Sequence, residues 1–401
     1  MEQDVLPNVA GGVTAAAGFT AAGVAAGIKR QGLDLAVLHA DRPCAVAGVF
    51  TRNRVKAAPV LLDMERVAQG TARTVVINSG NANACNGPRG MDDARACARE
   101  AGRLLGVPEE QVLVASTGVI GVPLPMEAML PGIARACREL SADGGARAAR
   151  AIMTTDTKPK ERAVSFAAGG QRITVGGMAK GSGMVHPDMA TMLCFVTTDA
   201  CIAPHDLRDA LRAAVDESFN MITVDGDTST NDLVLCLASG AGPRLSPGGD
   251  LDLFREALAV VCRDLARACA ADGEGARHLI TVQVAGAATV GDARACARAI
   301  AASSLVKAAV AGADANWGRI LCAAGYSGAA FDPARASVWL DDIRVAAAGT
   351  GLPFDEERAR SVLQKDEVVI RVDLAEGRCG ATAWGCDLTA DYVRINASYR
   401  S

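Results

Sequence analysis

The stretch AKGSGMVHPDMATMLCFV, residues 179–196, changes character in its middle. The first part, 179–190, is rich in glycine and contains Pro187, so it predicts a loop. The second part, 192–196, is a short apolar run that predicts a buried strand. Thr191 lies at the junction, where it either begins the strand as an ordinary β-branched residue or carries chemistry.

Strands and helices are expected on both sides of this stretch, but they do not alternate strictly. The predicted strands cover 33–39, 44–50, 74–77, 112–115, 162–167, 171–175, 192–196, 221–224, 233–237 and 278–285. The predicted helices cover 91–106, 126–140, 145–153, 205–219, 250–271 and 291–302. This mixed order favours an α/β fold in which mixed β-sheets are covered by helices. We expect a larger catalytic domain over 1–285 and a smaller C-terminal α/β domain over 286–401.

The composition indicates a folded protein with no electrostatic preference for nucleic acid. Of the 401 residues, 50% are hydrophobic and 21% are charged, which is typical of a globular chain with a large core. The net charge of −4 gives no argument for binding nucleic acid or an anionic membrane. The uncharged segment 11–28 is mostly alanine and glycine, and it follows acidic residues where a signal peptide has basic ones. We therefore expect a cytoplasmic protein.

The common signatures of metal, nucleotide and hydrolase sites are missing from the sequence. The thirteen cysteines include no CxxC pair and the four histidines are scattered, so we expect no metal site. Four of the cysteines, Cys97, Cys137, Cys269 and Cys296, lie in predicted helices and are expected to fill the core in a reducing compartment. The loop 176–182 contains Lys180, but the Gly-Lys-Ser/Thr order of a phosphate loop is absent. No GxGxxG follows a first strand, and no GxSxG is present.

The junction residue Thr191 has one specific route to reactivity. A threonine hydroxyl becomes a useful nucleophile only beside a base. If the peptide bond before Thr191 were broken, the residue would carry an α-amine whose pKa is about 7.7–8.0 in model compounds. That amine can accept the hydroxyl proton, directly or through a water. Spacing alone leaves both hypotheses open, the nucleophile and the ordinary strand residue.

Longer motifs favour the nucleophile. KGSGMVHPDMATML at 180–193 resembles the self-cleavage segment of the ornithine acetyltransferase family, the arginine-biosynthetic glutamate N-acetyltransferases. The resemblance continues in order along the chain with GFTAAGVAAGIK at 18–29, NSGNANACNG at 78–87, STGVIG at 116–121, MTTDTKPK at 153–160, VDGDTSTND at 224–232, DANWGRI at 314–320 and NASYRS at 396–401. By the number and order of these motifs, the chain is identified as a member of this family.

The resemblance implies a self-processed enzyme with a ping-pong reaction. The Thr191 hydroxyl would attack the carbonyl of Ala190 and split the chain into an α chain, 1–190, and a β chain, 191–401. The same hydroxyl would then take the acetyl group of N-acetylornithine and pass it to glutamate. The family also implies an αββα-like sandwich of the N-terminal-nucleophile type and an α₂β₂ heterotetramer.

Roles for individual residues follow from the same resemblance. Thr117 and Gly118 match the pair that stabilises the oxyanion of the tetrahedral intermediates. The positions that match the family's substrate contacts are Thr154, Lys180, Thr191, Glu274, Asn396 and Ser401. Lys180 would suit the α-carboxylate of the substrate, and Glu274 the ammonium of ornithine. Thr155 and Thr157 are alternatives to Thr154. Ser401 stands where many relatives have threonine, so a hydroxyl is kept.

Cofactor use and two rival hypotheses stay open in the sequence. No bound cofactor is expected, and acetyl-coenzyme A is a conceivable second acetyl donor on which the residues do not decide. A self-processing amidohydrolase or aminopeptidase with an N-terminal nucleophile would use Thr191 in the same way but release its product to water. A non-enzymatic binding protein of the same pathway would stay uncleaved.

Overall fold

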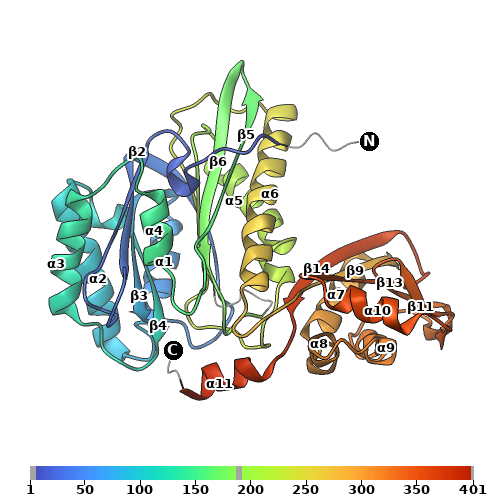
Figure 1. Cartoon of the computed structure of the whole chain (residues 1–401). Helices are drawn as coiled ribbons and strands as arrows, with labels where there is room; N and C mark the ends of the chain where they lie inside the picture. The colour runs from blue at the N-terminus through green and yellow to red at the C-terminus, as the bar shows by residue number, and fades with distance from the viewer. Residues whose placement is uncertain (1–5, 187–191, 399–401) are drawn as a thin grey trace.

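The computed structural model describes residues 6–186 and 192–398 and contains two mixed β-sheets with helices around them (Figure 1). The predicted α/β class with mixed sheets is therefore confirmed. The first sheet has eight strands in the order β4-β3-β2-β8-β7-β6-β5, with β1 paired to β2. Its strands are β1 (Phe19–Val24), β2 (Leu35–Phe50), β3 (Thr71–Asn81), β4 (Val112–Val119), β5 (Lys160–Ala168), β6 (Gln171–Lys180), β7 (Leu193–Thr198) and β8 (Leu233–Ala238).

The long strand β2 joins two layers of this sheet. Residues 35–40 of β2 pair with β1, residues 35–39 and 44–45 pair with β3, and residues 45–50 pair with β8. The register shifts between His39 and Cys44, so the strand carries an irregularity at this point. Two separate strands with a turn at 41–43 were predicted here, and that prediction is wrong. The charged and proline residues that suggest a turn lie instead within one strand that changes partners.

Buried side chains show how the layers stack. Along β7, Leu193 and Phe195 belong to a core shared with β2, β3 and β4, whereas Cys194 and Val196 belong to a core shared with helices. This alternation follows from the two-residue period of a strand. Each strand of this layer therefore buries one face against the other strand layer and one face against helices, which gives the expected helix–strand–strand–helix order.

Helices cover both outer faces of the sandwich (Figure 1). One outer core contains residues from β1 to β4 together with residues from α1 (Ala58–Val67), α2 (Gly87–Leu105) and α3 (Met126–Arg138). The opposite strand layer packs against α5 (Pro204–Asp216) and α6 (Gly249–Ala271). The short helix α4 (Gly145–Ala151) contributes Ala148, Ala149 and Ala151 to the core between the strand layers.

The second sheet has six strands in the order β12-β11-β10-β13-β9-β14. These are β9 (Leu279–Ala287), β10 (Ser337–Leu340), β11 (Ile343–Ala347), β12 (Thr350–Gly351), β13 (Glu367–Asp373) and β14 (Cys379–Cys386). The helices of this part are α7 (Val290–Ala302), α8 (Ser304–Ala311), α9 (Trp317–Gly325) and α10 (Glu356–Leu363). The predicted domain boundary at 285/286 falls inside β9. The last helix, α11 (Ala390–Ser398), runs back toward the first sheet (Figure 1).

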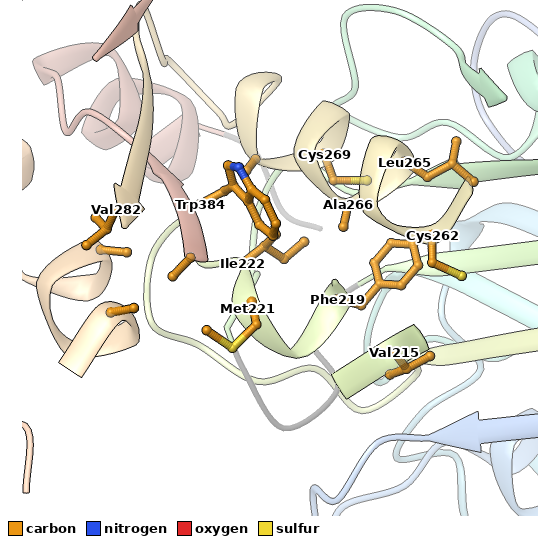
Figure 2. Packing of buried hydrophobic residues seen from close by; sticks show 14 of the residues in the cluster. Val215, Phe219, Met221, Ile222, Cys262, Leu265, Ala266, Cys269, Val282 and Trp384 are labelled. Carbon is orange, nitrogen blue, oxygen red and sulfur yellow. The ribbon is translucent and has the colours of Figure 1, made fainter. Parts of the chain in front are cut away.

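A continuous apolar core joins the two sheets. Figure 2 shows Trp384 of β14 and Ile222 in one cluster with side chains of α6, including Leu265 and Cys269. Ile222 and Trp384 form an isolated bridge. The predicted strand 221–224 is therefore wrong, because its apolar residues are buried at this junction and do not extend a sheet. All thirteen cysteines are free.

Among residues 6–186 and 192–398, no helix combines the length and the apolar character that crossing a membrane requires.

Candidate active site

A pocket lies where the first sheet meets the returning helix α11. It is formed by the ends of β4 and β6, by residues in 225–231 and by α11, and it contains about 640 Å³ that is partly open to solvent. Six residues predicted from the sequence line the pocket, namely Thr117, Gly118, Thr154, Lys180, Glu274 and Asn396. The other predicted site residues lie outside the described part of the chain, namely Ala190, Thr191 and Ser401.

Gly118 lies near the end of β4, beside β3. Its φ of +133° is a conformation that residues with a side chain rarely adopt. A Cβ at this position would lie 2.3 Å from the carbonyl carbon of Gly80 on β3. The position therefore requires glycine on two grounds, backbone conformation and space. The preceding residue, Thr117, is buried and borders the pocket.

Asparagine side chains fix the strand ends at the pocket. The Asn231 amide donates to the carbonyl oxygens of Ala82 and Ser116 at 2.6 and 2.8 Å. The Ser116 hydroxyl donates to Oδ1 of Asn78 at 2.6 Å. Because these groups are buried, their hydrogen bonds are costly to break. Since Ser116 precedes Thr117, they hold the part of β4 that borders the pocket.

Lys180, the last residue of β6, places a cation at the pocket. The residue is 2% exposed. Its Nζ donates to Oγ1 of Thr117 at 3.4 Å and lies 3.9 Å from Oδ2 of Asp156. An ammonium group has three N–H donors. Both contacts are long, so the residues at 6–186 and 192–398 leave the Lys180 ammonium donor capacity for an anionic ligand in the pocket.

Asp156 is the buried counterion of this lysine. Burial opposes ionisation of its carboxyl group, but the ammonium groups of Lys180 and Lys160 outweigh that effect, aided by hydrogen bonds from Lys160 and the Gly181 backbone. The pKa of Asp156 is lowered to about 2. Asp156 is therefore a fixed negative charge at neutral pH.

Glu274 follows α6 and supplies a negative charge to the pocket. Asn396 on α11 donates from Nδ2 to Oε2 of Glu274 at 2.8 Å, which connects the C-terminal helix to this loop. A Cβ at position 183 would lie 2.4 Å from the carboxyl carbon of Glu274. Gly183 therefore leaves the space that the Glu274 carboxylate occupies.

The three predicted threonines have different positions. Thr154 and Thr155 both line the pocket. Thr157 does not, because its backbone N–H and its hydroxyl both donate to the carboxylate of Asp272. The structure thus places two of the three alternatives where a substrate could contact them.

Asp225 and Tyr392 also line the pocket, and the sequence predicted no role for either. The Asp225 carboxylate accepts the backbone N–H groups of Met184 and Val185 at 2.6 and 2.9 Å, and burial raises its pKa. Burial and the negative charge of the nearby Asp225 carboxylate raise the pKa of the Tyr392 hydroxyl. The polar segment 225–231 was the available signal for Asp225, whereas nothing local marks a tyrosine brought in by the chain end.

Strand β7 begins next to the pocket. The backbone N–H of Met192 donates to Oδ1 of Asp232 at 3.0 Å. The following residue, Leu193, is paired with Lys180 on one side and with Leu233 on the other. The start of this strand is therefore held beside a lysine that lines the pocket.

The chain is similar to known proteins over nearly its full length. The model of the ArgJ family matches residues 20–401. Arginine biosynthesis bifunctional protein ArgJ of Symbiobacterium thermophilum is 58% identical, with 98% of this chain and 99% of that protein covered. The protein of the same name from Caldanaerobacter subterraneus subsp. tengcongensis is 52% identical, with 96% and 97% covered.

A crystal structure of arginine biosynthesis bifunctional protein ArgJ from Bacillus halodurans is also similar. It is 49% identical, covers 51% of this chain and 98% of its own chain, and superposes with a TM-score of 0.50. These matches confirm the resemblance seen in the motifs and do not favour the amidohydrolase alternative. The chain belongs to the ArgJ family, whose members in these comparisons are arginine biosynthesis bifunctional proteins.

Proposed function

We propose that this protein is a glutamate N-acetyltransferase that moves an acetyl group from N-acetylornithine to glutamate. The observation that carries the proposal is one pocket lined by a buried cation, Lys180, a buried anion, Glu274, and the Thr117–Gly118 pair. N-acetylornithine has an α-carboxylate and a terminal ammonium, so its two charges are complementary to Lys180 and Glu274. The acetyl group, on the α-nitrogen next to the carboxylate, would lie near the neutral strand end.

Thr191 is the proposed nucleophile. It immediately precedes Met192, whose N–H is bound to Asp232, and Leu193 is paired with Lys180. This anchoring of β7 supports a role for the preceding residue in the same pocket. Cleavage between Ala190 and Thr191 would create the α-amine that accepts the hydroxyl proton.

The proposed reaction has two half-steps. The Thr191 oxygen attacks the acetyl carbonyl, its proton passes to the α-amine, and the Thr117 hydroxyl and Gly118 N–H stabilise the oxyanion. The C–N bond then breaks, and ornithine leaves with a proton on its amine. In the second half-step the glutamate amine attacks acetyl-Thr191 and loses a proton, and the threonine hydroxyl is restored. Thr154, Asn396 and Ser401 are proposed as further substrate contacts.

The proposal extends to acetyl donors, assembly and location. Relatives 58% and 52% identical are named bifunctional, which supports acetyl-coenzyme A as a second donor for glutamate. No other cofactor is proposed. We expect the chains 1–190 and 191–401 to form an α₂β₂ heterotetramer in the cytoplasm.

Product analysis tests the transfer. Incubation with N-acetylornithine and glutamate should yield N-acetylglutamate and ornithine in equal amounts. A hydrolase would instead release acetate at the same rate without glutamate and form no N-acetylglutamate, and that outcome would overturn the proposal. The same assay with acetyl-coenzyme A and glutamate tests the second donor.

Denaturing electrophoresis tests the cleavage. Wild-type protein and Thr191→Ser, which keeps a hydroxyl, should show two chains. Thr191→Ala should remain one inactive chain near 41 kDa. Two chains from Thr191→Ala would refute the assignment of the Ala190–Thr191 bond.

A further inference from the structure

Two buried lysines lie close together beneath the pocket but have different surroundings. Lys160 begins β5 and Lys180 ends β6, and the two strands are paired so that Lys160 faces Ala179. The exposed fractions are 3% for Lys160 and 2% for Lys180. Only Lys180 lines the pocket. The two lysines also differ in their contacts with neighbouring carboxylates.

Lys160 is fully engaged by carboxylates. Its Nζ donates to Oδ1 of Asp156 and to Oδ2 of Asp272, each at 2.6 Å. Both carboxylates are buried with it. Lys180 lies only 3.9 Å from Asp156 and makes a long contact to Thr117. Lys160 therefore neutralises and holds the carboxylates of Asp156 and Asp272. Within the described residues, Lys180 makes only long contacts and keeps donors for a ligand.

Asp156 connects Lys180 to the chain around it. Its Oδ1 accepts the backbone N–H of Gly181 at 2.7 Å, and its Oδ2 accepts that of Thr154 at 3.1 Å. One carboxylate thus holds the residue after Lys180 and the pocket threonine, in addition to Lys160. A fixed charge with this many contacts determines the position of Lys180 and the charge around it.

Asp272 connects Lys160 and Asp156 to the loop that carries Glu274. Its carboxylate accepts the Thr157 N–H at 3.0 Å, and its carbonyl oxygen accepts the Ser182 hydroxyl at 2.6 Å. The Glu274 N–H in turn donates to the carbonyl oxygen of Ser182 at 2.9 Å. The loops that carry Lys180 and Glu274 are therefore tied to the same buried charges.

We propose that Asp156, held in place by Lys160 and Asp272, is a positioning residue that aims the Lys180 ammonium at the α-carboxylate of the substrate. This inference rests on the proposed acetyl transfer. Donor and acceptor amino acids share the α-carboxylate, so a single pre-oriented ammonium serves both half-steps. Orientation of this kind is lost when a supporting charge is removed, and a displacement of about 1 Å can cost about 100-fold in rate.

The test compares two acetyl donors in wild-type protein and in Asp156→Asn. One donor is N-acetylornithine, and the other is N-acetylputrescine, which has the same amide and ammonium but lacks the α-carboxylate. Asp156→Asn should lower kcat/KM for N-acetylornithine about 100-fold more than that for N-acetylputrescine, because only N-acetylornithine carries the α-carboxylate. Wild-type preference for the carboxylate should therefore disappear in the variant.

Other outcomes overturn the inference. Equal losses for both donors would show that Asp156 supports the fold in general, and unchanged preference would show that it does not position Lys180. Wild-type protein that transfers acetyl from neither donor would refute the proposed function, which is a separate failure.

A second variant covers the case in which Asp156→Asn does not fold. Asp156→Glu keeps the buried charges balanced and shifts the carboxylate by one methylene. Folded Asp156→Glu should lose part of the preference for N-acetylornithine, and a folded variant with the full preference would refute the inference. Asp63→Asn is the matched control. Asp63 is a fully buried carboxyl outside the pocket, bound to the Val114 N–H at 2.9 Å, and its replacement should not change the preference.

Discussion

The two sides of the pocket are built by different interactions. The neutral side, Thr117, Gly118 and Asn231, depends on strand pairing, uncharged hydrogen bonds and a close backbone contact. The charged side, Lys180 and Glu274, depends on buried ionic groups and the loops that they hold. Substitutions that change shape should therefore act on the neutral side whatever the charge of the substrate. Substitutions on the charged side should lower kcat/KM only for substrates that carry the charged group which the substituted residue contacts.

Gly118→Ala should have the largest effect. The new Cβ would meet the backbone of β3 in a conformation that alanine disfavours, so the oxyanion contacts would be displaced. Loss of one such contact typically lowers kcat by about 10²–10³-fold. Steady-state kinetics should show this loss equally for N-acetylornithine and N-acetylputrescine.

Gly121→Ala is the matched control for that variant. Gly121 also has a positive φ, +80°, but a Cβ there would meet nothing within 4 Å. Its activity should stay within a few-fold of wild type. Comparable losses in both variants would mean that backbone strain, and not the contact with Gly80, explains the result.

Lys180→Met should have the next largest effect and should depend on substrate charge. A hydrogen bond to a charged group contributes about 1.5–3 kcal/mol, so kcat/KM for N-acetylornithine should fall about 10- to 100-fold. The fall should be much smaller for N-acetylputrescine. An equal fall in kcat/KM for both donors would show that Lys180 acts through its contact with Thr117 and not by binding the α-carboxylate.

Low pH should lower the stability of the folded protein, because it protonates Asp156 on the charged side of the pocket. The pKa of this carboxyl is lowered from 3.8 to about 2 in the folded protein, so its contribution is present above pH 4 and is lost as pH falls toward 2. The shift corresponds to about 2 kcal/mol of the free energy of unfolding. Urea unfolding of wild type and Asp156→Asn should show a difference that shrinks between pH 4 and pH 2.

Asp63→Asn should show the opposite trend with pH. Burial raises the pKa of Asp63, so its carboxyl contributes stability at low pH that is lost as pH rises through the folded pKa. If both variants show the same pH dependence, the ion pairs of Asp156 do not explain the acid response.

Tyr392→Phe should have the smallest effect. Removing the hydroxyl takes a polar group off the pocket wall near the Asp225 carboxylate, and the loss of one polar contact costs about 1 kcal/mol. The expected result is a rise in KM of a few-fold with kcat nearly unchanged, because α11 contributes to the wall and not to the neutral strand end. A fall in kcat at unchanged KM would give α11 a role in the chemical step.

Local patterns in the sequence predicted the strand beside the pocket, whereas the family resemblance predicted the residues on its charged and neutral sides. The apolar run 192–196 is strand β7 in the structure, which spans Leu193–Thr198. The strand predicted over 112–115 is β4 in the structure, which extends to Val119 and so includes Thr117 and Gly118. These features are local, because strand periodicity and glycine conformations depend on neighbouring residues.

Other features depend on partners that are distant in the sequence. The segment 41–43 has the composition of a turn, yet it lies in β2 because that strand pairs with β1 and β3 at one end and with β8 at the other. The apolar residues at 221–224 resemble a strand, yet they are buried against β14. In both places tertiary pairing and burial outweighed local preference.

By itself, the sequence determined the family of the chain, the strand that follows Thr191 and six of the residues that line the pocket. Only the tertiary structure decided that Lys160 and Lys180 have different roles. Asp272 is 112 residues from Lys160, and their contact arises because α6 ends beside the start of β5. The residue type determines the functional group of a side chain. The charge around that group depends on which distant carboxylates the fold buries beside it.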